Sequence, residues 1–135
     1  MVFPIDNGKT AGNKTSRAFT LIELMVVMAI VATLLSVVVP RYFEGLKRSK
    51  ETVLKEDLKE MRNAIDHYFE DKNTYPASLE TLVTERYIKF IPEDPVTDSK
   101  ESWQTVMPPD NSNKVYDIRS GSTETSSDGT TYNSW

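Results

Sequence analysis

The sequence has 135 residues, enough for one domain, and an apolar N-terminal segment leaves about 95 of them for a globular unit. The formal net charge is −4, with +2 in the first eighteen residues and −6 in the remainder, and an acidic domain argues against nucleic-acid binding. The chain has no cysteine, which excludes disulfides, thiolate catalysis and cysteine metal sites.

An almost wholly apolar stretch occupies residues 19–40 and follows a short basic segment. Between Phe19 and Val39 every residue is apolar or small and neutral except Glu23. At about 1.5 Å per residue, a helix of this length spans a hydrocarbon core of roughly 30 Å. A carboxylate near one end of such a span costs on the order of a few kcal/mol, so Glu23 is expected to have a partner. The alternative is a simple membrane anchor in which Glu23 extends to the interface.

Pro40 follows the apolar stretch, and a proline normally ends or kinks a helix. Because residues 41–72 also have a helical pattern, the sequence predicts one long helix that is kinked at Pro40 and continues beyond it. Apolar residues of this second half recur at threes and fours and form one stripe: Leu46, Val53, Leu54, Leu58, Met61, Ile65, Tyr68 and Phe69. Charged residues on the opposite face are expected to meet solvent or a neighbouring subunit: Lys50, Glu51, Lys55, Glu56, Lys59, Glu60 and Asp66.

The rest of the chain predicts short elements that cover the helix stripe. Residues 78–82 read as one helical turn capped by Ser78. Residues 102–107 and 114–119 are rich in β-branched and aromatic residues and are separated by a turn, which predicts two antiparallel strands. The expected fold class is therefore α+β, with a long N-terminal helix packed on a small antiparallel sheet.

The N-terminal residues carry a specific resemblance. The string Ser16-Arg17-Ala18-Phe19-Thr20-Leu21-Ile22-Glu23-Leu24 resembles the prepilin-peptidase site of type IV pilins and of type II secretion pseudopilins. In that family a basic leader is removed on the cytoplasmic face, just before a phenylalanine that becomes the N-methylated terminus. The family usually has glycine before the cut, where this chain has Ala18.

The resemblance implies a leader peptide at residues 1–18, a transmembrane and polymerisation helix at residues 19–40, and a periplasmic pilin-like domain at residues 41–135. Cleavage would fall between Ala18 and Phe19. The amine of Phe19 would then neutralise Glu23 of an adjacent subunit and set the assembly register, and the family carries a proline at the place of Pro40.

Farther along, residues 75–76 and 91–95 (Tyr-Pro and Ile-Pro-Glu-Asp-Pro) resemble the loop after the long helix in the major pseudopilin of type II secretion. The resemblance implies a non-enzymatic subunit of a helical homo-oligomeric filament that drives protein export. Its implied partners are minor pseudopilins, an inner-membrane assembly platform, the prepilin peptidase and, before assembly, membrane lipid. The alternative within the family is a type IV pilin of a surface filament; a membrane-anchored enzyme or binding protein is disfavoured because no nucleophile, acid pair or histidine cluster is evident.

The polar segment at residues 120–135 ends in aromatic residues, so it is expected to fold back on the domain. Its hydroxyls, carboxylates and carbonyls suit a hard cation. The segment also resembles the C-terminal loop of major pseudopilins, which holds calcium, and the calcium candidates here are Ser122, Glu124 and Asp128. A hydrogen-bonded loop without an ion is the alternative.

Overall fold

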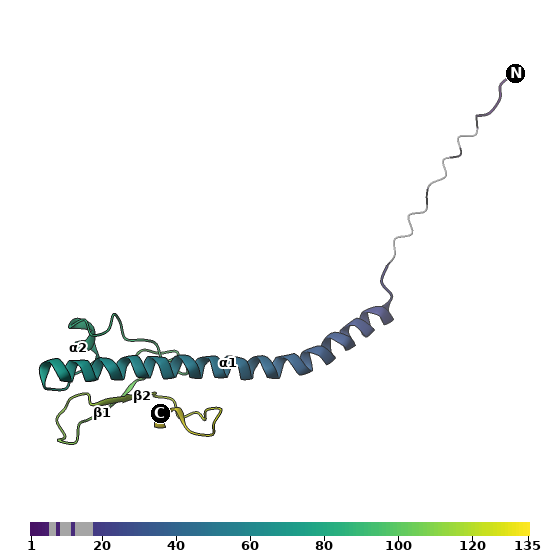
Figure 1. Cartoon of the computed structure of the whole chain (residues 1–135). Coiled ribbons are helices and arrows are strands. Elements are labelled where there is room, and N and C mark those ends of the chain that lie inside the picture. The colour runs from purple at the N-terminus through teal and green to yellow at the C-terminus, as the bar shows by residue number, and fades with distance from the viewer. Residues whose placement is uncertain (6–7, 9–11, 13–17) are drawn as a thin grey trace. The chain divides into compact units, whose positions relative to one another are not determined.

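The structure, a computed structural model, describes residues 1–5, 8, 12 and 18–135, so the predicted leader lies largely outside the described residues. The chain divides into two compact units, Met1–Val39 and Pro40–Trp135. The α+β architecture predicted from the sequence is confirmed, since a long helix and a small antiparallel sheet make up the fold (Figure 1).

One helix, α1 (Leu21–Lys72), runs through 52 residues and includes Pro40 in its interior. The predicted continuation beyond Pro40 is therefore confirmed, while its kink stays a prediction. The helix ends where Asn73 takes a left-handed conformation with φ of 54°, and the amide of Asn73 donates to the carbonyl of Phe69 at 2.8 Å. Asparagine tolerates this conformation well, so it is a suitable C-terminal stop.

Within the unit Met1–Val39, the helical residues are exposed on every side, and all except Glu23, Thr33 and Ser36 are apolar. Their most apolar window of eighteen residues has a mean hydropathy of 2.7 and no buried residue. The two hydroxyl side chains are satisfied within the helix, because Thr33 donates to the carbonyl of Ala29 at 2.8 Å and Ser36 donates to that of Thr33 at 2.7 Å. Internal satisfaction of polar groups is what a hydrocarbon environment requires.

Within the unit Pro40–Trp135, one face of α1 forms the core. Its buried residues follow helical spacing: Leu54, Leu58, Met61, Ala64, Ile65 and Tyr68. They pack with buried residues from the rest of the unit: Leu79, Leu82, Ile88, Trp103, Val115, Ile118 and Tyr132. Three members of the predicted stripe lie at its margin, since Leu46, Val53 and Phe69 keep 42%, 48% and 37% of their surface exposed. The buried stripe is thus narrower than the sequence pattern suggested.

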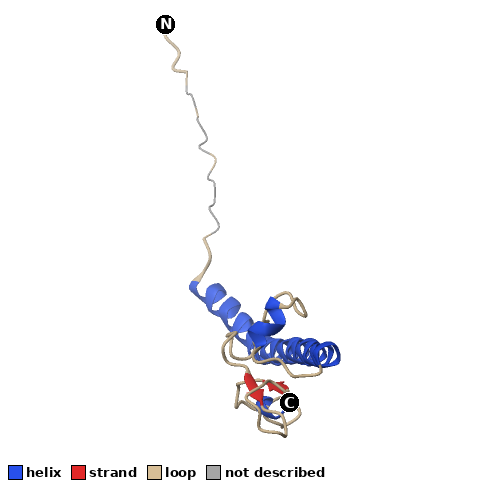
Figure 2. Cartoon of the chain, turned by 90° about the vertical axis from the view of Figure 1, so that its left-hand side faces the viewer, coloured by secondary structure: helices blue, strands red, loops and turns tan. Residues whose placement is uncertain are grey.

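Short elements and loops cover this face. Helix α2 (Leu79–Thr84) begins at Ser78, whose hydroxyl accepts from the amide of Thr81, so the predicted cap is confirmed. Strands β1 (Gln104–Val106) and β2 (Asp117–Arg119) pair antiparallel with Thr105 opposite Ile118. A 3₁₀ turn, η1 (Tyr132–Ser134), comes last. Figure 2 shows that most of the chain around the second half of α1 is loop, with the strands as a small patch.

Arg62 joins α1 to the strand layer. Its Nε donates to Asp117 Oδ1 at 2.8 Å, and one terminal nitrogen donates to the carbonyl of Ile118 at 2.9 Å and to the backbone oxygen of Trp135 at 2.8 Å. The planar fork of arginine makes this three-way contact possible, which a lysine cannot reproduce. The side chain therefore fixes β2 and the last residues against the helix.

Candidate functional site

The predicted processing and assembly residues lie at the start of α1. Ala18 and Phe19 precede the helix and are exposed, with 89% of Phe19 accessible. Phe19 and Glu23 line one shallow apolar groove together with Ile22, Val26 and Val27. The structure thus places the two residues of the expected assembly pair on the same surface of one subunit.

Glu23 also has a local role that the sequence reasoning missed. The amide of Thr20 donates to Glu23 Oε2 at 2.8 Å, and the amide of Glu23 donates to the hydroxyl of Thr20 at 3.2 Å. This is a capping box, in which Thr-x-x-Glu satisfies two of the orphan amides at a helix start. The signal was present in the sequence as Thr20 and Glu23 three residues apart. The carboxylate is therefore held beside Phe19, at the positive end of the helix dipole.

The three calcium candidates, Ser122, Glu124 and Asp128, have different neighbours in the structure. The buried hydroxyl of Ser122 accepts from the amide of Glu124 at 3.2 Å. Asp128 Oδ1 accepts from the hydroxyl of Ser126 and from the amide and hydroxyl of Thr130, the latter two at 2.9 and 2.6 Å. Hydrogen bonds from Ser126 and Thr130 lower the pKa of Asp128 to about 2. Asp128 therefore stabilises its own turn.

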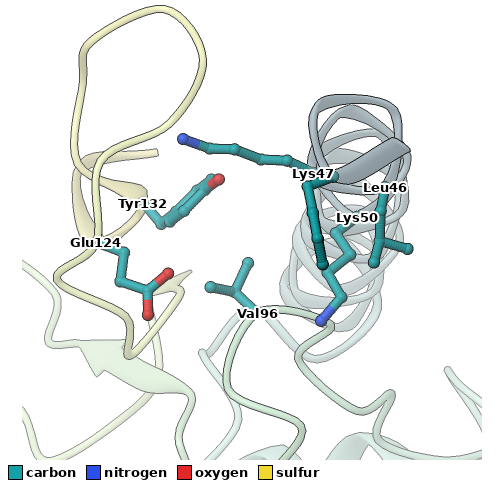
Figure 3. Close-up of a pocket in the computed structure, with 7 residues that line it drawn as sticks. Leu46, Lys47, Lys50, Val96, Glu124 and Tyr132 are labelled. Atoms are coloured by element: carbon teal, nitrogen blue, oxygen red, sulfur yellow. The ribbon is translucent and has the colours of Figure 1, made fainter. Parts of the chain in front are cut away.

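Glu124 lies instead at a groove of about 260 Å³ between α1 and the C-terminal loop. Figure 3 shows its side chain extending toward Val96, with Lys47 and Lys50 reaching from α1 on the opposite side. Two ammonium groups at the same groove oppose the entry of a dication.

The fit to calcium can be judged from these contacts. The carbonyls of Ser122 and Glu124 already accept from the amides of Asn133 and Tyr132 at 3.0 and 3.1 Å. In the part of the chain that the structure describes, no group of three Asp, Glu, His or Cys side chains gathers as a metal site. The candidates do not fit a common calcium site in this arrangement, so calcium stays a prediction from the resemblance.

Glu51 is the residue whose position differs most from expectation. The helix pattern put it on the charged outer face, but only 8% of it is exposed. Its Oε1 accepts from the amide of Ser127 at 2.7 Å and from the hydroxyl of Tyr132 at 2.9 Å. The hydroxyl of Ser127 lies 2.8 Å from both carboxylate oxygens. We call Glu51, Ser127 and Tyr132 the Glu51 cluster.

The electrostatics of the Glu51 cluster agree with its geometry. Burial raises the pKa of Glu51, but hydrogen bonds from Ser127 and Tyr132 and the nearby charge of Lys47 outweigh it and leave the pKa below its usual value. Burial and the bond to Glu51 raise the pKa of Tyr132 to about 12. The cluster therefore holds an ionised carboxylate and a neutral phenol. No local signal in the sequence marks Glu51, because its partners follow 76 and 81 residues later.

Comparison with known proteins agrees with the N-terminal geometry. The model of the prokaryotic N-terminal methylation motif matches residues 13–39. The type II secretion system core protein G of Klebsiella michiganensis is 30% identical over 98 residues, which cover 61% of this chain and 69% of the relative. The protein of the same name from Escherichia coli K12 is 35% identical over 95 residues, covering 58% of this chain and 66% of the relative.

A pilin is also similar. The type IV major pilin protein PilA of Myxococcus xanthus is 38% identical over 63 residues, 47% of this chain and 29% of the relative. The chain thus spans less than two thirds of the length of several curated relatives that it matches. No solved structure matches it. The methylation motif at the start of α1 and a match over most of the Klebsiella protein together show that the chain belongs to the family of type II secretion system core protein G.

Proposed function

We propose that this chain is a non-catalytic structural subunit that polymerises into a helical filament driving protein export by type II secretion. One observation carries the proposal: the first part of α1 leaves its large apolar side chains exposed in the single subunit, with Glu23 held among them. An exposed apolar helix of this length needs lipid or sister helices around it. The names of the relatives, a secretion core protein and a pilin, support the same role.

Assembly would exchange one partner of Glu23 for another. In the single subunit the carboxylate accepts from the amide of Thr20. After cleavage between Ala18 and Phe19, the N-methylated amine of Phe19 in an adjacent subunit would provide a cationic partner. An ion pair that is satisfied on both sides is much less costly in an apolar bundle than a lone carboxylate. The exchange would therefore favour one register of packing.

The location and partners follow from the same proposal. Before assembly the helix would cross the inner membrane once, with the unit Pro40–Trp135 in the periplasm. Tyr42 and Phe43 are exposed just after the apolar stretch, where aromatic residues commonly lie at the membrane interface. Minor pseudopilins, an inner-membrane platform and the prepilin peptidase would act on this form.

Replacement of Glu23 tests the proposal. Glu23→Ala is expected to enter the membrane fraction normally but to lower filament yield by about tenfold or more, because the register-setting pair is lost. Glu44→Ala, which removes an exposed carboxylate of α1 beyond the apolar stretch, is the matched control and should assemble normally. Membrane fractionation and electron microscopy of sheared material measure the two effects. Equal filament yield for both variants would contradict the proposal.

A type IV pilin of a surface filament is the second candidate, favoured by the match to the Myxococcus pilin. Deletion of the gene separates the two. Loss of secretion without loss of long surface fibres supports the secretion role. Loss of long surface fibres with intact secretion supports the pilin role instead.

A further inference from the structure

The C-terminal loop, residues 120–135, is packed on the domain although it contains few acids. Ser120, Ser122 and Ser126 are buried, and 2% of Tyr132 is exposed. The loop closes on itself through a β-bridge between Thr125 and Thr131 and a hydrogen bond from the amide of Ser126 to the carbonyl of Thr130 at 2.7 Å. These contacts shape the loop but do not attach it to α1. Arg62 of α1 holds the last residue, Trp135, so the attachment of the loop between residues 120 and 134 needs a further group.

The Glu51 cluster supplies that attachment. A single carboxylate of α1 is bonded by a backbone amide and two hydroxyls of the loop, at 2.7 to 2.9 Å. Hydrogen bonds to an ionised acceptor are roughly twice as strong as neutral ones, and this acceptor is largely removed from water. Because the donors follow Glu51 by 76 and 81 residues, the cluster joins distant parts of the chain.

The arrangement reverses the polarity of a calcium site. A bound cation gathers several oxygen ligands around a positive centre. Here a negative centre on α1 gathers donors from the loop. Of the acids of the loop, Asp128 accepts hydrogen bonds within its own turn, and Glu124 lines the groove beside Tyr132 and Lys47. Positive charge from side chains is also present, since Lys55 Nζ lies 4.6 Å from the centre of the Trp135 ring and Lys47 acts on Glu51. The charged centre around which the loop donors gather is thus a side chain, Glu51.

We propose that the carboxylate of Glu51 takes the place of a metal ion in ordering the C-terminal loop, so that this subunit folds without calcium. The inference concerns the single subunit and does not depend on the filament proposal. It assigns to Glu51 a structural role that the loop composition alone would give to calcium.

The first test measures calcium dependence of the full chain in detergent. Thermal unfolding followed by tryptophan fluorescence is compared in millimolar calcium chloride and in excess EGTA, because Trp103 and Trp135 lie in the folded unit. We expect the same midpoint in both and no saturable heat on calorimetric titration with calcium. A midpoint that rises by several degrees with calcium, or saturable binding, would overturn the inference.

The second test removes the acceptor. Glu51→Gln keeps the size of the side chain but presents an amide group to the donors of Ser127 and Tyr132, so the unfolding midpoint should fall by several degrees. Glu56→Gln, an exposed position on the same helix, is the matched control and should shift it by about a degree or less. Equal midpoints for the two variants would show that Glu51 does not order the loop.

A milder variant keeps the test decisive if Glu51→Gln does not fold. Tyr132→Phe removes one donor and leaves the ring in the core, so its midpoint should fall by less than that of Glu51→Gln. The tryptophan emission of the folded state should also change, because the rings of Tyr132 and Trp135 lie 5.2 Å apart, centre to centre. An unchanged midpoint for Tyr132→Phe would count against the inference, whatever the behaviour of Glu51→Gln.

Discussion

The two parts of α1 have the same secondary structure and opposite surroundings. From Leu21 to Val39 the large apolar side chains keep 42 to 77% of their surface exposed. After Pro40 one face of the same helix is covered by loops and strands, and Leu58 and Met61 are almost completely buried. The first part is left uncovered in the single subunit, while one face of the second part is covered by other residues of the same chain.

This difference shows how an apolar sequence pattern indicates function. A helix that is apolar on all sides predicts lipid or a bundle of helices around it, whereas a single stripe predicts a domain core. Both patterns occur here within 52 residues. The helix thus joins an uncovered apolar part to a part that contributes to the core of the subunit.

The largest effect should come from a leucine-to-alanine substitution in the covered part of α1, compared with the same substitution in the exposed part. Leu58→Ala is expected to lower the free energy of unfolding by about 2–5 kcal/mol, because it leaves a cavity in the core. Leu34→Ala removes the same atoms from a side chain that is 61% exposed and should leave domain unfolding unchanged. Denaturant unfolding of the full chain in detergent compares them. Similar losses for both variants would mean that the two parts are not energetically distinct.

The next largest loss of stability should come from a steric change just after β2. Gly121→Ala would place a methyl group 2.0 Å from the carbonyl oxygen of Ser102, so the backbone must move, at a cost of about 1–3 kcal/mol. Gly45→Ala is the control, since nothing lies within 4 Å of its added carbon and alanine favours a helix. Urea midpoints should therefore shift in opposite directions. An unchanged urea midpoint for Gly121→Ala would show that the backbone around Gly121 can move at little cost in stability.

Many of the elements that cover the second part of α1 were predictable from the sequence, because they depend on local signals. The serine cap of α2, the two strands and the continuation of α1 follow from residue types within a few positions. The strands are shorter than predicted, with three residues each, since the ladder consists of three residue pairs, from Gln104 opposite Arg119 to Val106 opposite Asp117.

Glu51 and Arg62 were not predictable in the same way. Helix periodicity treats a charged residue as exposed, but both side chains find partners that come more than fifty residues later in the chain. Their contacts depend on where later segments return to the helix, which no local pattern encodes. The calcium candidates show the same limit, since composition indicates which oxygens are present but not where they point.

The contact made by Arg62 can be tested with a conservative change. Arg62→Lys keeps the charge but loses the fork that reaches Asp117 and two backbone oxygens, so a loss of about 1–2 kcal/mol is expected. Arg48→Lys, at an exposed position of α1, should change stability by less than about 0.5 kcal/mol. Thermal unfolding measures both. Equal stability of the two variants would rule out a structural role for the fork.

The smallest expected effect is a gain in stability that depends on pH. Burial and the nearby charges of Glu60, Asp94 and Glu56 raise the pKa of Asp57 above its usual value. The ionised form is therefore less favourable in the folded state than in the unfolded chain, and it lowers stability at pH above the folded pKa. Asp57→Asn removes this cost and should gain up to about 0.5 kcal/mol at pH 7.

The sign of the pH dependence distinguishes this effect from a general change in packing. Below the unfolded pKa of Asp57, the carboxyl is protonated in both states, so the advantage of Asp57→Asn should disappear. Glu70→Gln, at an exposed position on α1 where the carboxylate lies 3.3 Å from His67 Nδ1, should show little advantage at either pH. Urea unfolding at pH 7 and near pH 3 gives the change in the free energy of unfolding for each of the two variants at each pH. An equal gain in the free energy of unfolding at both pH values would mean that the amide improves local contacts. The burial and the neighbouring charges of Asp57 would then not be the cause of the gain.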